Sequence, residues 1–379
     1  MFKISKEQEE WVELTWGKVN EKLLRLAVKS RDKLPYTVVN GVHSDNSETA
    51  VYKWTNGFWP GMMWLMYRQT GNNTYRLTAE NAEKLLNRAF YQFDKLHHDV
   101  GFMWKLSSGA NYRLTGNLES RNTTLLAAAM LTSRYNIDGG YIRAWNGTEE
   151  QRGRSIIDCM MNIPLLYWAS SEIGDPRFAK IAKRHAEMTL RDHIRPDGSV
   201  NHIVDHDPET GEMIGAYAGQ GYSETSCWSR GQAWAIYGCI LSYIYTQDKN
   251  FLYAAIKTAN YFTANVIQYQ YLAPVDFRAP LYPQYMDSTA GLCAACGMLE
   301  LAKYVSEAES GTYVNTAIQI LKATDTAFCD YGENDYLVGM GTERYPHNSM
   351  NGVHIPIIYG DFFLVEALLK LKGSEFLIW

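Results

Sequence analysis

The sequence predicts an all-α fold, an (α/α)6 barrel in which six helical hairpins close into a toroid, with long loops forming a site at one mouth. Two observations predict it. Apolar residues recur at spacings of three and four along most of the chain. A weak repeat extends over more than 300 residues: a helix ends, a short polar turn follows, and an aromatic residue starts the next helix. Because no Ser/Pro-rich linker or charge block divides the chain, we expect one domain over residues 1–379.

The predicted helices follow one another closely, and their number fits six hairpins. The junctions carry residues suited to helix ends: Gly to the C-cap, Asp to the N-cap and Pro to the first turn. These residues are Gly71 with Tyr75, then Gly174, Asp175, Pro176 and Phe178, then Asp248 with Phe251. The helices are expected at 6–28, 57–69, 77–95, 119–135, 153–173, 176–192, 228–246, 250–267, 288–307, 311–328 and 360–372.

Four connecting segments have turn and strand character and are long for a compact domain. They span 97–117, 136–152, 194–227 and 268–287. Long loops of this kind are usually functional, and rigid scaffolds commonly carry their sites on them. We expect these loops to line one mouth of the barrel.

Composition narrows the class of protein. The net charge of −5 argues against a nucleic-acid partner, which needs a basic surface, but not against an anionic sugar held by one or two local arginines. The 11 Trp and 26 Tyr include more large rings than a core requires, and such rings stack on sugar faces. No run of 18 apolar residues and no secretory leader occurs, so we expect no membrane span.

The six cysteines lie mostly in apolar, helix-like stretches, which is typical of free core thiols in a reducing cytoplasm. Cys293 and Cys296 form one C-x-x-C, but no second pair completes a zinc site. We therefore expect a cytoplasmic protein, a monomer or weak homo-oligomer, without metal or cofactor.

Asp158 is the first candidate for chemistry. It lies in RSIIDCMMNIPLLYWA, an apolar stretch that we expect to be helical. A carboxylate in such surroundings is paired, solvated by a cavity or partly protonated. A structural interpretation has Asp158 bonded to Asn162, four residues on, or capping a neighbouring loop. A chemical one uses the raised pKa of a desolvated carboxyl group, which can then donate and accept a proton near neutrality.

Asp99 is the second candidate, in the polar loop KLHHDVGFMW after a predicted helix. The loop could simply cap that helix, with histidine near its dipole. A metal site is the other interpretation, but the adjacent His97 and His98 are expected to point in different directions and no spaced third ligand is evident. We predict no metal there.

The segment GAYAGQGYSETSCWSRGQAWAIYG is the third candidate. It places Gln220 in a Gly-flanked loop and Trp228, Arg230 and Trp234 at the start of a helix. A guanidinium beside two indoles suits a planar carboxylate on a sugar ring, although an ordinary helix start with core aromatics has the same pattern. His202, Trp54 and Trp145 are each more often surface or packing residues when taken singly.

Together these motifs resemble the unsaturated glucuronyl hydrolases of glycoside hydrolase family 88, from about Trp54 to about Leu371. The matching stretches are WTNGFWPGMMWLMY, LHHDVGFMW, YIRAWNG, IIDCMMNIPLLYWASSEIGDPRF, DPETGEMI, QGYSETSCWSRGQAWAIYG, MDSTAGLCAACGMLE and YGDFFLVEALLKL. The resemblance implies an (α/α)6 barrel that acts on oligosaccharides left by polysaccharide lyases. It implies hydration of the C4=C5 enol ether and release of the unsaturated uronic acid, without a cofactor.

The resemblance also implies roles for individual residues. Asp158 would be the general acid and base, and Asp99 would hold sugar hydroxyls and support the transition-state charge. The residues implied to bind or orient the substrate or water are His98, His202, Gln220, Trp54, Trp145, Trp228, Arg230 and Trp234.

Two positions depart from the family pattern, and the substrate stays open. Asn56 replaces an acid in the first motif, and Tyr359 replaces a tryptophan in the last. Some members bind sulfated fragments through a Ser/Lys cluster, whereas YPHNSMNGVHIPII contains no lysine. Two alternatives remain: a hydrolase of the related family that acts on unsaturated rhamnogalacturonan or ulvan fragments, and a sugar-binding relative without turnover.

Overall fold

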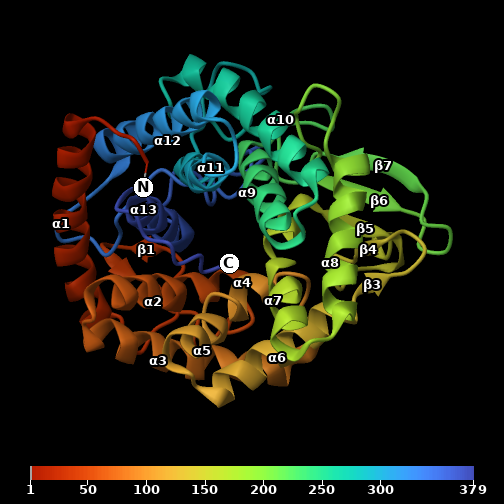
Figure 1. Cartoon of the computed structure of the whole chain (residues 1–379), viewed down its shortest axis with the longest axis horizontal. Helices are drawn as coiled ribbons and strands as arrows, with labels where there is room; N and C mark the ends of the chain where they lie inside the picture. Colours follow the sequence, from red (N-terminus) through yellow and green to blue (C-terminus); the bar gives the residue numbers. More distant parts are fainter. Residues whose placement is uncertain (1) are drawn as a thin grey trace.

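The structure is a computed structural model that describes residues 2–379, and its fold is an (α/α)6 barrel (Figure 1). Outer and inner helices alternate along the chain, and the inner helix α13 contacts both α11 and α2, which closes the ring. The outer helices are α1 (Lys6–Lys29), α3 (Asn73–Asn87), α6 (Leu118–Thr132), α8 (Pro176–Met188), α10 (Lys249–Val266) and α12 (Glu307–Phe328). The inner ones are α2 (Phe58–Thr70), α4 (Val100–Trp104) with α5 (Ser108–Thr115), α7 (Pro164–Ile173), α9 (Ser229–Thr246), α11 (Ser288–Leu301) and α13 (Ile358–Leu371).

Burial explains the two layers. Every residue of α11 and α13 is buried, as expected for helices enclosed on all sides. The outer helix α3 instead buries one stripe, including Tyr75, Ala79, Ala82 and Leu86, at spacings of three and four. The hydrophobic core is continuous from Val12 to Trp379.

The predicted helix ends are confirmed. Gly71 and Gly174 adopt positive φ values of 69° and 68° at the C-caps of α2 and α7. The carboxylates of Asp175 and Asp248 accept backbone N–H groups at the N-termini of α8 and α10. These short turns reverse the chain between neighbouring helices.

Two predictions of secondary structure were wrong. The segment 97–117, predicted to be a loop, contains α4 and α5. The helix predicted at 153–173 is divided into strand β5 (Arg154–Ile156), the 3-10 turn η4 (Ile157–Met161) and α7. Pro164 opens α7, because a proline is tolerated in the first turn but lacks the N–H that a helix interior needs. Asp158 therefore lies on a turn after a strand and not within a long helix.

The strands are short and lie between helices. Strand β5 pairs antiparallel with β6 (Ile203–His206), which pairs with β7 (Met213–Tyr217). Two further hairpins are β1 (Val38–Val39) with β2 (Val42–His43), and β3 (Tyr135–Asn136) with β4 (Tyr141–Ile142). The remaining short helical segments are η1 (Trp54–Gly57), η2 (Arg88–Lys95), η3 (Glu149–Gln151), the π-helical η5 (Thr189–His193) and η6 (Ile267–Tyr269). Across residues 2–379, no helix is both long and apolar enough to cross a bilayer.

Candidate active site

A cavity of about 290 Å³ lies where loops from both halves of the chain meet. Eight of the ten predicted site residues line it. Its lining residues are Tyr36, Lys53, Trp54, His97, His98, Asp99, Trp145, Ile156, Asp158, His202, Gln220, Arg230, Glu343, Arg344 and Tyr359. The predicted residues that it does not include are Trp228 and Trp234.

Asp158 is placed in the cavity by the junction of β5 and η4. The Ile157 N–H donates to the carbonyl of His202 at 3.1 Å, which ties this turn to the start of β6. The side chain of Asp158 is 14% exposed, and its Oδ2 lies 3.5 Å from Nε2 of His202. Among the described residues, neither of these two atoms has a hydrogen-bond partner. Asp158 therefore presents an unsatisfied carboxylate oxygen to whatever enters the cavity.

Asp99 is the more deeply buried of the two carboxyl groups. It forms the N-cap of α4, and its side chain is 9% exposed. Burial raises its pKa well above the ordinary value, and the charge of Asp158 raises it further. Asp99 therefore keeps a proton at pH values where an exposed aspartic acid has lost it.

Asn162 connects the two carboxyl groups. Its amide nitrogen donates to Oδ1 of Asp99 at 2.9 Å and to the backbone carbonyl of Asp158 at 3.2 Å. Its amide oxygen accepts the N–H of Phe102 at 2.8 Å. The structural interpretation of the sequence, in which the Asp158 carboxylate bonds to Asn162, is therefore wrong, because the amide bonds to the peptide group of Asp158 instead. Sequence reasoning did not identify Asn162 as a residue of the site.

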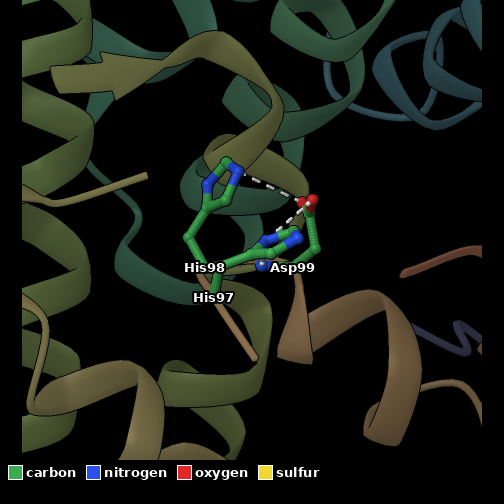
Figure 2. A group of neighbouring side chains, drawn as sticks. All are labelled: His97, His98 and Asp99. Atoms are coloured by element: carbon green, nitrogen blue, oxygen red, sulfur yellow. Dashed lines mark hydrogen bonds and ion pairs between the residues drawn. The ribbon is translucent and has the colours of Figure 1, made fainter. Parts of the chain in front are cut away.

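His97 and His98 both direct a ring nitrogen toward Asp99 (Figure 2). The distances are 3.4 Å from Nδ1 of His97 to Oδ2 and 3.4 Å from Nε2 of His98 to Oδ1. The expectation that the adjacent rings diverge was wrong. Burial lowers the pKa of His97 to about 4 and that of His98 well below its ordinary value, so both rings are neutral near pH 7. One ligand atom from each of the three residues lies within 4.8 Å of the others, so this group could hold a metal ion.

His202 is oriented by Gln220. The backbone N–H of Gln220 donates to Nδ1 of His202 at 2.8 Å, so Nδ1 is the acceptor and the N–H of the ring is at Nε2, which faces Asp158. The side-chain amide of Gln220 donates to the carbonyl oxygen of Glu343. Its amide oxygen accepts no hydrogen bond from the described residues and remains for a ligand or water.

Arg230 lines the cavity but is itself 1% exposed and heavily bonded. Its Nη1 donates to the carboxylate of Asp287 and to the carbonyl of Thr342, and its Nη2 donates to the carbonyl of Glu343. Of the five guanidinium hydrogens, the one on Nε and one on Nη2 have no acceptor among the described residues. These two form the part of Arg230 that could meet a carboxylate.

Some of the aromatic residues line the cavity, and another is buried behind the residues that line it. Trp54 and Tyr359 line the cavity with rings stacked 5.3 Å apart, and Trp145 lines it as well. The ring of Trp228 is buried beneath His202 and Arg230, at 4.3 Å from the imidazole centroid and 4.6 Å from the guanidinium carbon. Trp228 therefore supports the site from below.

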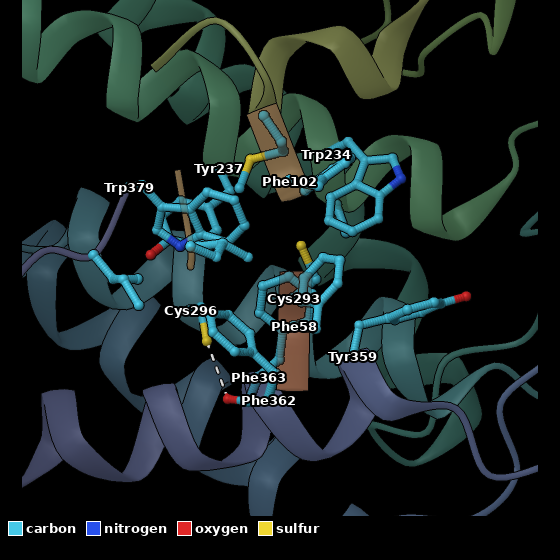
Figure 3. Close-up of a cluster of buried hydrophobic side chains, with 14 of the residues drawn as sticks. Phe58, Phe102, Trp234, Tyr237, Cys293, Cys296, Tyr359, Phe362, Phe363 and Trp379 are labelled. Atoms are coloured by element: carbon cyan, nitrogen blue, oxygen red, sulfur yellow. Dashed lines mark hydrogen bonds between the residues drawn. The ribbon is translucent and has the colours of Figure 1, made fainter. Parts of the chain in front are cut away.

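Trp234 is fully buried in the core and is not brought to the cavity (Figure 3). It packs against Phe102 and Phe363, with centroids 5.3 and 5.8 Å away. The predicted arrangement of Arg230 between two indoles is therefore corrected: the second ring is Tyr359, 5.5 Å from the guanidinium. Tyr359 thus occupies a position that contacts both Trp54 and Arg230.

Four polar or charged lining residues were not found from the sequence. Tyr36 and Lys53 come from the connection between α1 and α2, and Glu343 and Arg344 come from that between α12 and α13. The hydroxyl of Tyr36 donates to the carboxylate of Glu343, which joins the two connections. The length of the second connection was the available signal, because long loops are often functional.

Asn56 does not contact the cavity. Its amide donates to the carbonyls of Ala50 and Val51 at 3.0 Å each and accepts from the side chain of Asn46 at 3.0 Å. An acid could not donate in this way unless it were protonated. The departure at Asn56 is therefore a matter of loop hydrogen bonding.

An all-helical barrel whose cavity holds two coupled carboxyl groups between histidines and aromatic rings has the features of a carbohydrate hydrolase. The chain belongs to glycosyl hydrolase family 88, whose profile matches residues 27–308. It is 37% identical to the unsaturated glucuronyl hydrolase of Bacillus sp. (strain GL1) over 348 residues, 89% of this chain and 90% of the relative. It is 34% identical to an unsaturated chondroitin disaccharide hydrolase of Streptococcus pneumoniae over 347 residues, 88% of this chain and 84% of the relative.

Solved structures agree with this family. The unsaturated glucuronyl hydrolase of Bacillus sp. GL1 superposes with a TM-score of 0.87 at 32% identity, over 94% of this chain and 97% of that one. A mutant of the Streptococcus agalactiae enzyme complexed with dGlcA-GalNAc6S superposes with a TM-score of 0.81 at 27% identity, over 98% and 93%. The chain is thus a glycoside hydrolase with the fold of these enzymes.

Proposed function

We propose that the chain removes a 4,5-unsaturated glucuronic acid from the non-reducing end of oligosaccharides of the kind that glycosaminoglycan lyases leave. The observation that carries this proposal is the coupled pair Asp99 and Asp158 in one cavity. The names of the relatives and the bound dGlcA-GalNAc6S of one structural neighbour support this substrate class.

The proposed reaction is hydration of the C4=C5 double bond. Asp158 donates a proton to C4 of the enol ether, and positive charge of the oxocarbenium type develops at C5 and the ring oxygen. Water adds to C5 and returns a proton to Asp158. The hemiketal then opens, its C1 linkage breaks, and the second sugar leaves. One carboxyl group serves as acid and then as base, so no second nucleophile is needed.

The neighbours of Asp158 support this cycle. Asp99, whose pKa is raised by burial and by the charge of Asp158, keeps a proton within the site at pH values where an exposed aspartic acid has lost it. The Nε2–H of His202 points toward Asp158 and is placed to orient the incoming water. No step passes through a metal ion or a cofactor.

Substrate orientation is assigned to the rest of the lining. The two remaining N–H groups of Arg230 would bind the ring carboxylate, and the Gln220 amide oxygen would bind a hydroxyl or water. Trp54 and Trp145 offer flat faces for the sugar rings, and His98 with Asp99 offers partners for hydroxyl groups.

A panel of lyase-made disaccharides tests the proposal. Turnover removes the conjugated alkene, so ultraviolet absorbance falls as product forms. Loss of absorbance with unsaturated chondroitin or hyaluronan disaccharides is the expected result. Turnover confined to rhamnogalacturonan or ulvan fragments would assign the chain another substrate, and binding without turnover on every member would make it a sugar-binding protein.

The proposed setting of this reaction is the cytoplasm, with the chain acting as one catalytic unit and as a monomer or weak homo-oligomer. All six cysteines are free, and five of them are buried. Free thiols in this number are typical of a reducing compartment.

A further inference from the structure

We propose that Lys53 and Arg344 form a second anion-binding subsite of the cavity, which takes a sulfate or carboxylate group of the substrate. The proposal rests on the proposed function and extends it to residues outside the family motifs quoted above. It concerns which substrates the chain prefers, and not whether the chain is a hydrolase.

Lys53 is a cation with the charge of Glu343 nearby but without a direct ion pair to a described residue. It lies in the connection just before Trp54, and its ammonium stands 3.1 Å from the centroid of the Tyr36 ring. Among the side chains that the structure describes, none forms an ion pair or hydrogen bond with it. Partial burial lowers the pKa of Lys53, while the charge of Glu343 opposes this effect. A partly desolvated ammonium gains free energy when an anion replaces its lost hydration.

Arg344 is the second such cation. It is exposed at the edge of the cavity, and no hydrogen bond or ion pair of its guanidinium occurs within the described part of the chain. The neighbouring carboxylate of Glu343 is already the acceptor of the Tyr36 hydroxyl. Residues 345–357 add no further lysine or arginine. Arg344 is therefore the last cation that this connection offers to a ligand.

Arg230 differs from these two residues. Its charge is compensated by Asp287, and three of its hydrogens are committed to acceptors within the protein. The cavity also contains the carboxyl groups of Asp158 and Glu343, which disfavour an anionic substrate. Lys53 and Arg344 are the charges that offset this repulsion. Their anion has two possible sources: a sulfate on the leaving sugar, or the carboxylate of the unsaturated ring itself.

Steady-state kinetics of Lys53→Gln and Arg344→Gln test the proposal. The matched controls are Lys84→Gln and Arg68→Gln, two exposed cations on α3 and α2 that form no hydrogen bond or ion pair with the described side chains. Three substrates separate the sources: an unsulfated unsaturated chondroitin disaccharide, its 6-sulfated form, and the methyl ester of the unsulfated form. KM is expected to rise about threefold to tenfold for an anion that loses its charged partner. Lys53→Arg should restore most of the lost affinity.

The pattern of KM values identifies the anion. A rise confined to the sulfated substrate assigns the subsite to the leaving sugar. An equal rise in KM for the unsulfated and the 6-sulfated disaccharide, with no rise for the methyl ester, assigns the subsite to the ring carboxylate. Unchanged KM values for all three substrates, or equal rises that include the unsulfated ester, would overturn the proposal. If the wild-type chain turns over none of the three, the proposed function fails first, and the two failures are therefore distinguishable.

Discussion

Nε2 of His202 and Oδ2 of Asp158 face each other across 3.5 Å, and neither has a hydrogen-bond partner in the described chain. This separation exceeds that of a normal hydrogen bond. A proton-carrying histidine nitrogen and a carboxyl oxygen are thus close enough to contact the same water molecule or substrate atom, and neither is bonded to the other. The first prediction follows from this arrangement.

Asp158→Asn should lower kcat by about three to four orders of magnitude, because an amide cannot transfer the proton to C4. The measurement is the loss of alkene absorbance with the best disaccharide of the panel. Asp138→Asn, the same change at an exposed loop position, serves as the control and should retain wild-type rates. Substantial turnover by a folded Asp158→Asn variant would exclude the assigned role.

Arg230→Lys should raise KM about tenfold or more while the protein stays folded. Lysine keeps a positive charge beside Asp287 but loses the planar fork that suits a carboxylate. Arg230→Ala is a poor test of binding, because it leaves the buried Asp287 unpaired and should cost about 3–5 kcal/mol of stability. Thermal melts of both variants distinguish these effects. An unchanged KM in Arg230→Lys would place the ring carboxylate elsewhere.

Asn162→Ala should lower kcat about tenfold to a hundredfold, although Asn162 does not line the cavity. Its amide positions Asp99 and holds the Asp158 peptide group. Because Asp99 loses a donor that favours its ionised form, the basic limb of the pH profile should move to higher pH. If Asn162 had only a structural role, the substitution would lower kcat at all pH values and would not move the basic limb of the pH profile.

Asp99→Asn should lower activity and raise stability near neutral pH. The folded protein keeps the Asp99 proton at pH values where the unfolded chain has lost it, because burial raises this pKa. The folded state then binds more protons than the unfolded state, so stability falls as pH rises above the ordinary range of aspartate. The gain in Tm from Asp99→Asn should therefore be larger at pH 8 than at pH 4. A gain that is independent of pH would contradict this assignment.

Buried histidines should make the protein acid-sensitive. His185 is fully buried, and its pKa is lowered to about 3 by desolvation and by the charges of His193 and His206. The unfolded imidazole binds a proton below about pH 6.5, whereas the folded one does not, so stability falls as pH drops from about 6.5 toward 3. His185→Asn keeps an acceptor for the Ile142 N–H and should reduce the difference in Tm between pH 7 and pH 4.5. If the difference in Tm between pH 7 and pH 4.5 is the same in the variant and the wild type, His185 is not a source of the acid sensitivity.

The helical barrel could be predicted because its signals are local. The apolar period and the caps at Gly71, Gly174, Asp175 and Asp248 act within a few residues. The region around Asp158 was misjudged because an apolar run with β-branched residues suits both helix and strand. Its pairing with β6, some 50 residues away, decided the outcome.

Site residues were predictable where a motif carried them, and less so where only the fold brings them together. Lys53 and Glu343 lie far apart in the sequence and meet at Tyr36 through two unrelated connections. Asn162 is an ordinary amide in sequence, and its importance comes from the approach of α4, where a Cβ on Gly101 would lie 2.5 Å from the Asn162 Cα. Whether Trp234 reaches the cavity depends on which face of α9 is directed toward it. Because α9 is buried along most of its length, its sequence has no polar face from which that direction could be predicted.

The carbonyl oxygen of Glu343 accepts from both Gln220 and Arg230. A single peptide group thus sets the position of two side chains that reach it from different parts of the barrel. Neither Gln220 nor Arg230 can move toward a new ligand by itself without losing its hydrogen bond to this carbonyl oxygen. A change of sugar preference is therefore expected to require a different backbone conformation of the connection between α12 and α13, because that change would move Gln220 and Arg230 together.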